Sequence, residues 1–134
     1  MNAKSQNYVP KPPLLIDAAY SERLEDLAFE AMHRAPAVAR QLLEEVRRAE
    51  VRPSGQLPEN VVTIGSQVTF RDDADAQQTV QLVFPQNADI SAGRISVLTP
   101  IGAALIGLSL GQTISWETPE RKVRHLTVVN VVQP

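Results

Sequence analysis

The sequence predicts an α+β fold: an antiparallel, coiled-coil-like hairpin of two helices, followed by an antiparallel β-sheet domain with one short helix. Three observations predict it. Apolar residues recur every three or four positions between residues 17 and 50, they alternate with polar residues after residue 61, and a short apolar stretch, TPIGAALIG, interrupts the alternation. A period near 3.6 indicates amphipathic helices, whereas a period of two indicates half-buried strands.

Four segments follow from these patterns. Residues 1–13 are polar, end in a proline-rich run and are expected to form an extended tail. Residues 14–52 are expected to form the helical hairpin, residues 53–60 a polar linker, and residues 61–134 the sheet domain. With 134 residues, of which 43% are hydrophobic, the chain is long enough to bury one ordinary core.

The first helix of the hairpin is expected to begin after Asp17, whose carboxylate can cap it, with Ser21 as a later alternative for the cap. It is expected to end near His33 and Arg34. Pro36 suits the first turn of a helix and is expected to begin the second one. The hairpin tip therefore contains His33, Arg34 and Pro36. Each helix has an apolar seam, at spacings of three and four, that predicts packing of one helix on the other. The seams are Tyr20, Leu24, Leu27 and Ala31, then Ala39, Leu42, Val46 and Ala49.

Five alternating runs are expected to be the strands of the sheet. They begin near residues 68, 80, 95, 114 and 123, and segments rich in Asp, Asn, Gly and Pro join them. Three aspartates, Asp72, Asp73 and Asp75, follow the first run. A calcium site would need more oxygen ligands at a regular spacing, so we interpret this cluster as a hairpin turn.

The stretch from Thr99 to Gly107 is expected to form a short helix. Thr99 can cap it, Pro100 suits its first turn, and Gly107 can end it in a left-handed conformation. Most of its apolar side chains are expected to seal the sheet. Pro100 and Ile101, at its start, are candidates for contact with another protein.

Composition excludes several classes of function. A net charge of −2 argues against a dedicated nucleic-acid-binding protein, and the absence of cysteine excludes disulfides and thiolate chemistry. His33 and His125 lie in different halves of the chain and form no ligand cluster. We therefore expect no catalytic, cofactor-binding or metal-binding residues. No signal peptide or membrane span is apparent, which predicts a cytoplasmic protein.

Residues 95–119, ISVLTPIGAALIGLSLGQTISWETP, resemble the signature of the bacterial GreA/GreB family of transcription elongation factors. In that signature Ser or Thr and Pro precede an aliphatic residue, Gly, any residue, Ala, two more aliphatic residues and Gly. The resemblance implies an FKBP-like fold for the sheet domain and docking on RNA polymerase at the rim of the secondary channel. The partner-binding residues that it implies are Thr99, Pro100, Ile101, Gly102, Ala104, Leu105 and Gly107.

The chain departs from the family pattern in its hairpin. In the family the hairpin is long, enters the channel and carries an acidic pair that helps to hold a metal ion for cleavage of backtracked RNA. Here the hairpin is shorter, and residues 31–38, AMHRAPAV, contain no carboxylate. A metal ion is not held without oxygen ligands, so we expect no transcript cleavage. The sequence is more similar to the family members whose hairpin is short and lacks the acidic tip.

These observations predict a non-enzymatic regulator that binds RNA polymerase as a monomer, in competition with the longer Gre factors. An alternative is an FKBP-like interaction or assembly module whose hairpin pairs with a second copy. Peptidyl-prolyl isomerase activity is a weaker alternative, because such a site needs an aromatic-lined pocket. The chain has only three Phe, two Tyr and one Trp.

Overall fold

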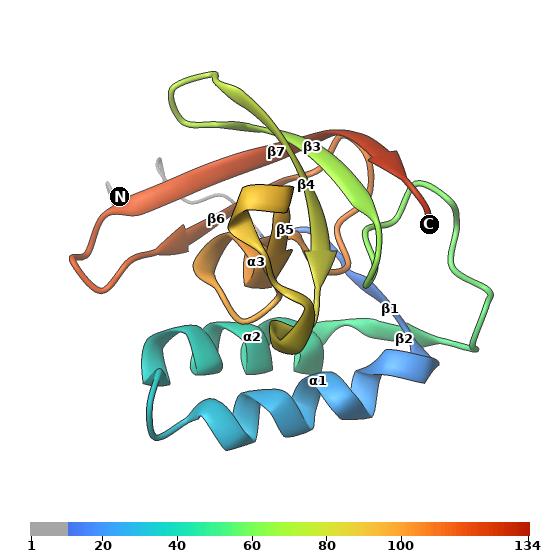
Figure 1. Ribbon diagram of the computed structural model, residues 1–134, viewed down its shortest axis with the longest axis horizontal. Helices are drawn as coiled ribbons and strands as arrows, with labels where there is room; N and C mark the ends of the chain where they lie inside the picture. The colour runs from blue at the N-terminus through green and yellow to red at the C-terminus, as the bar shows by residue number, and fades with distance from the viewer. Residues whose placement is uncertain (1–10) are drawn as a thin grey trace, which may run out of the picture.

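Residues 11–134 are described by a computed structural model, in which two helices lie along one side of a curled sheet (Figure 1). The elements of the N-terminal part are β1 (Leu15–Asp17), α1 (Ala18–Ala31), α2 (Pro36–Arg48) and β2 (Glu50–Arg52). Those of the C-terminal part are β3 (Gln67–Asp72), β4 (Gln77–Val83), the 3₁₀ helices η2 (Pro85–Asn87) and η3 (Ile90–Ala92), β5 (Arg94–Ser96), α3 (Pro100–Leu105), β6 (Thr113–Glu117) and β7 (Val123–Val132).

Helices α1 and α2 form the predicted hairpin, and local chemistry sets their ends. The Asp17 carboxylate accepts a hydrogen bond from the backbone N–H of Ala19 at 2.8 Å and caps α1, as the sequence predicts. Pro36 begins α2. Leu24 and Leu42, from the two predicted seams, are fully buried. Of the predicted tail, residues 1–13, the first ten residues lie outside the described part of the chain.

The sheet has five strands in the order β5-β4-β3-β7-β6. The prediction that it is antiparallel throughout was wrong at one edge, where β5 runs parallel to β4. A long connection through η2 and η3 joins these strands, and it brings the chain back beside Gln81 of β4, where β5 begins with Arg94. The sheet is therefore mixed. The sequence patterns also missed the short parallel pair β1–β2, which closes the base of the hairpin.

Helix α3 packs beneath the curled sheet (Figure 1). The Thr99 hydroxyl accepts a hydrogen bond from the backbone N–H of Gly102 at 3.0 Å, and Gly107 has the left-handed φ of 83° that ends the element. Both were predicted. The side chains of Ala103, Ala104 and Leu105 are fully buried.

One hydrophobic cluster joins the hairpin to the sheet. It contains Leu24 and Leu42 of the hairpin together with Leu82 and Ile114 of the sheet, and Leu14 just before β1 belongs to it. The hairpin therefore lies against the sheet domain rather than projecting from it. Within residues 11–134, no helix is long and apolar enough to cross a membrane.

Candidate protein-docking site

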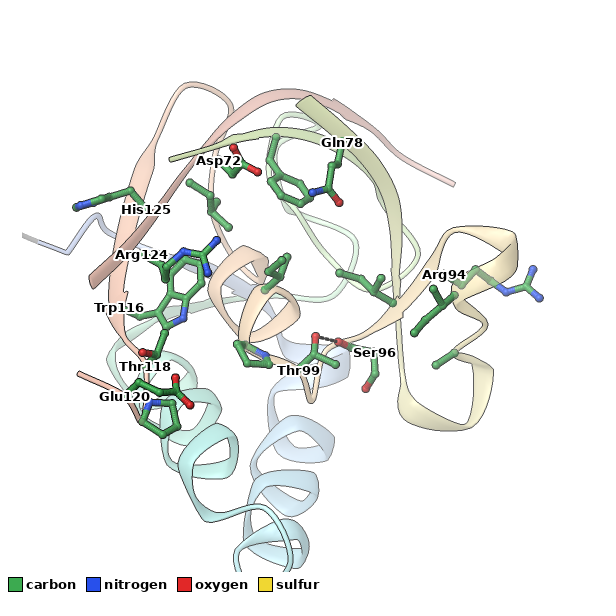
Figure 2. Close-up of a pocket in the computed structure, with 18 residues that line it drawn as sticks. Asp72, Gln78, Arg94, Ser96, Thr99, Trp116, Thr118, Glu120, Arg124 and His125 are labelled. Carbon is green, nitrogen blue, oxygen red and sulfur yellow. Dashed lines mark hydrogen bonds between the residues drawn. The ribbon is translucent and has the colours of Figure 1, made fainter. Parts of the chain in front are cut away.

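A groove of about 620 Å³ opens between the sheet and the start of α3 (Figure 2). We call it the α3 groove. Buried Phe70 of β3 and Leu126 of β7 lie at its floor, where alternation along each strand turns them toward α3. Half-buried Ile95, Ile101 and Trp116 form its sides. Such a concave apolar surface, reachable from solvent, is suited to binding side chains of another molecule.

The charged groups at the rim of the α3 groove are largely engaged with one another. Arg124 donates to the Asp73 carboxylate at 3.1 Å, and Arg94 lies 3.6 Å from that of Asp89. Glu120 is exposed beside the groove. Because most of the charges at its rim are paired, the groove offers a partner apolar contact rather than a strong electrostatic potential.

The loop carrying η3 presents an unusually exposed apolar side chain to the groove. Ile90 is 86% exposed and belongs to the groove lining. Beside it, the Ser91 hydroxyl donates a hydrogen bond to Asp89 at 2.6 Å and lowers the pKa of that carboxyl, with smaller help from backbone N–H groups and Arg94. These bonds hold the loop in place while Ile90 stays open to contact.

The predicted partner-binding residues divide into two groups in the structure. Thr99, Pro100 and Ile101 line the α3 groove, and Pro100 is exposed. The other four residues are buried in this structure and do not line the groove. These are Gly102, Ala104, Leu105 and Gly107.

The hairpin tip borders a second hollow of about 350 Å³, which we call the tip depression. Pro36 and Val38 of α2 lie on one side of it, and Pro100, Trp116 and Pro119 lie on the other. The last three also line the α3 groove, so the two hollows are continuous. The other predicted tip residues, His33 and Arg34, are exposed on the turn between the helices but do not line either hollow.

Sequence reasoning missed several groove residues. Ile90 could have been noticed as a lone isoleucine in a polar connection, whereas Pro119 carries no signal of its own. On an alternating strand, Trp116 is expected from the sequence to be core or partner surface. In the structure its ring lies at the junction of the two hollows, and its indole N–H is buried without a hydrogen-bond partner among the described residues.

Asp72, at the end of β3, acts as a turn residue. Asp72 accepts hydrogen bonds from the backbone N–H groups of Ala74 and Ala76 at 2.9 and 3.1 Å, as the turn interpretation requires. Across residues 11–134, no three acidic or histidine side chains are placed to hold a metal ion.

This combination of a helical hairpin, a curled sheet and the capped α3 stretch agrees with comparisons to known proteins. The family described as "Transcription elongation factor, GreA/GreB, C-term" matches residues 57–133. The chain belongs to the GreA/GreB transcription elongation factor family, as the sequence resemblance predicts.

Within that family the chain is similar to the regulator of nucleoside diphosphate kinase (Rnk) of Escherichia coli strain K12. The two are 34% identical over 122 residues, which cover 90% of each chain. Transcription elongation factor GreA of Methylobacterium nodulans is 31% identical over 125 residues, covering 87% of this chain and 79% of that protein. A solved GreA/GreB structure from Nitrosomonas europaea superposes with a TM-score of 0.69 at 35% identity, covering 89% of this chain and 98% of that one.

Proposed function

We propose that this protein is a non-enzymatic, cytoplasmic transcription regulator that binds RNA polymerase near its secondary channel through the α3 groove. It competes there with the longer Gre factors and does not stimulate transcript cleavage. The observation that carries the proposal is that the exposed part of the family signature, at Pro100, lies in an open apolar groove. Membership of the GreA/GreB family supports RNA polymerase as the partner.

The absence of cleavage is proposed from the hairpin tip. The tip presents His33 and Arg34 to solvent, and no carboxylate lies between residues 31 and 38. The nearest on α1, Glu30, is a single side chain, and a hard divalent cation needs several oxygen ligands. The FKBP-like relationship of the sheet domain is part of the same proposal, supported by a groove at the start of the one helix that the sheet covers.

The test is a binding titration of labelled protein against bacterial RNA polymerase, with unlabelled GreA as competitor. The parent protein should bind, and excess GreA should displace it. Pro100→Glu should weaken binding at least about tenfold, because a charge would then enter an apolar contact. Position 100 is exposed in the first turn of α3, where Glu is compatible with the helix, so this variant should fold normally.

Pro53→Glu is the matched control, because Pro53 is also exposed but lies in the connection after β2. It should bind like the parent. Stalled elongation complexes incubated with the parent should show no added cleavage, whereas GreA in the same assay should cleave. An absence of binding at micromolar concentrations, or equal binding of Pro100→Glu, would refute the groove as the polymerase site.

A second candidate is self-association through the hairpin, and one observation favours it. Phe29 on α1 is 50% exposed, with the Arg47 guanidinium 5.3 Å from its ring centre. Sedimentation measured over a hundredfold range of concentration would reveal a dimer. Loss of that dimer in Phe29→Ser would support the assembly module over the monomeric regulator.

A further inference from the structure

A buried carboxylate lies at the base of the hairpin, far from the tip. Glu45 of α2 is 0% exposed, in a position where an unpaired charge would strongly destabilise the fold. Both of its oxygens are paired: Lys11 approaches one at 3.2 Å, and the Arg48 guanidinium donates to the other. The buried Glu45 carboxylate is stable only while Lys11 and Arg48 remain beside it. It therefore holds the chain segment around Lys11 against α2.

Lys11 belongs to a segment, residues 11–17, that crosses the base of the hairpin, and we call it the strap. Arg48 donates a second hydrogen bond, to the Pro12 carbonyl at 2.6 Å, so one arginine joins Glu45 to the strap backbone. Further on, the Leu14 carbonyl accepts from the backbone N–H of Glu50 at 2.9 Å, and β1 pairs with β2. The strap is therefore hydrogen-bonded both to the C-terminal end of α2, through Arg48, and to β2, the strand that follows α2.

The opposite side of the strap is held by the end of the α3 stretch. The backbone N–H of Leu15 donates to the Gly107 carbonyl at 3.1 Å. A Cβ atom built on Gly107 would lie 3.1 Å from both the Leu14 Cβ and the Leu15 carbonyl oxygen, so the two backbones touch. The strap thus connects the base of the hairpin to the same stretch whose first residues line the α3 groove.

A second contact joins the hairpin to the groove directly. The Gln41 side chain of α2 donates to the Pro100 carbonyl at 3.0 Å. With the base held by the strap and the middle of α2 held by Gln41, the hairpin lies along the sheet domain with its tip below the β6–β7 turn (Figure 1). In this position Pro36 and Val38 face Trp116 and Pro119 across the tip depression.

We infer that the strap locks the hairpin against the sheet domain and so makes the hairpin tip a fixed wall of the partner-binding surface. The hairpin is then not an independently swinging arm. A partner bound in the α3 groove then contacts the tip at a fixed distance from the groove. The strap, which fixes the tip, and the tip, which contacts the partner, therefore both contribute to the partner's affinity. The link to affinity rests on the proposed function, whereas the locking itself does not.

The locking is tested by a distance measurement, and the cysteine-free chain suits it. Nitroxide labels are placed through Glu30→Cys on α1 and Asn130→Cys on β7, both of which are exposed. Pulsed electron resonance on the parent should give one narrow distance distribution. Lys11→Met and Arg48→Met each remove a contact between the strap and α2, and both should broaden or shift that distribution.

Arg47→Met is the matched control. Arg47 neighbours Arg48 on α2, but it lies 3.5 Å from Glu25 of α1 and makes its ion pair within the hairpin. Its removal should leave the distance unchanged. Lys11→Met decides the matter even where Arg48→Met fails to fold, because the Lys11 side chain is 35% exposed and lies outside the helices.

The same variants are then titrated against RNA polymerase. If the locked state falls to about a tenth of the population, affinity falls about tenfold, and Lys11→Met should show this loss while Arg47→Met does not. Unchanged distances in both strap variants would overturn the locking. Changed distances with unchanged affinity would overturn the role of the tip. A parent that does not bind polymerase would refute the proposed function, while the distances would still decide the locking.

Discussion

At Gly102 the start of α3 approaches the backbone at the end of β5 too closely for a side chain. A Cβ atom built there would lie 2.1 Å from the Ser96 carbonyl oxygen. The same oxygen accepts a hydrogen bond from the Thr99 hydroxyl at 2.7 Å, so the cap of α3 and this approach depend on each other. Position 102 therefore requires glycine because of this steric contact and not because of its backbone conformation, since the φ of Gly102 is not left-handed.

Gly102→Ala should therefore lower the free energy of unfolding by about 3 kcal/mol, because the backbone must move to accept the methyl group. Gly93→Ala is the comparison. Gly93 has a left-handed φ of 75° but no atom within 4 Å of the added Cβ, so its loss should be about 1–2 kcal/mol. Urea unfolding followed by Trp116 fluorescence measures both. Equal losses would contradict the steric explanation.

The pKa of Asp89 offers a second test at single-residue scale. Since it is lowered below the ordinary value of 3.8, chiefly by the hydrogen bond from Ser91, the ionised carboxyl favours the folded loop. That contribution is complete above pH 3.8 and is lost as the pH falls through the lower, folded value. Ser91→Ala should raise the pKa of Asp89, as followed by carboxyl NMR titration. Ser109→Ala, remote from this loop, should leave it unchanged.

Among the elements, the turn between β3 and β4 depends on one carboxylate. Asp72→Ala leaves the N–H groups of Ala74 and Ala76 without their acceptor and should lower the free energy of unfolding by about 1–2 kcal/mol. Asp72→Asn keeps an acceptor oxygen and should lose less. Millimolar calcium should not change the melting temperature of the parent. A calcium-dependent rise that Asp72→Asn abolishes would contradict the turn interpretation.

Element ends were predictable from sequence where the deciding chemistry is local. Asp17, Pro36 and Thr99 each mark a helix start through groups within three residues of themselves. The parallel pairing of β5 with β4 was not predictable in this way, because a strand's direction depends on where its connection returns. Periodicity along a strand is the same in either orientation.

The candidate site was predictable only in part, for the same reason. Thr99, Pro100 and Ile101 come from one continuous motif, and they do line the α3 groove. The remainder of the groove is assembled from β3, the η3 loop and the β6–β7 turn, which meet only after the sheet has formed. The burial of Glu45 could not be predicted from the sequence either, because Lys11, one of the side chains that pair with it, lies 34 residues away.

On the scale of the whole molecule, the hairpin and the sheet domain share a single hydrophobic cluster. Leu42 of α2 and Leu105 of α3 both belong to it and are both fully buried. Elements that share a core lose it together, so the hairpin should not unfold before the sheet.

Two probes in this chain report on different elements. Trp116 is the only tryptophan and lies on β6, whereas α1 and α2, with 14 and 13 residues against 6 in α3, dominate the helical circular dichroism. Both signals should change at the same urea concentration. Leu42→Ala should lower the free energy of unfolding by about 2–4 kcal/mol and shift both transitions equally. Leu43→Ala, at a partly buried neighbour, should cost less. Loss of helical signal before the tryptophan signal would instead mean that the hairpin is a separate unit, held to the sheet domain by the strap and the Gln41 contact rather than by a shared core.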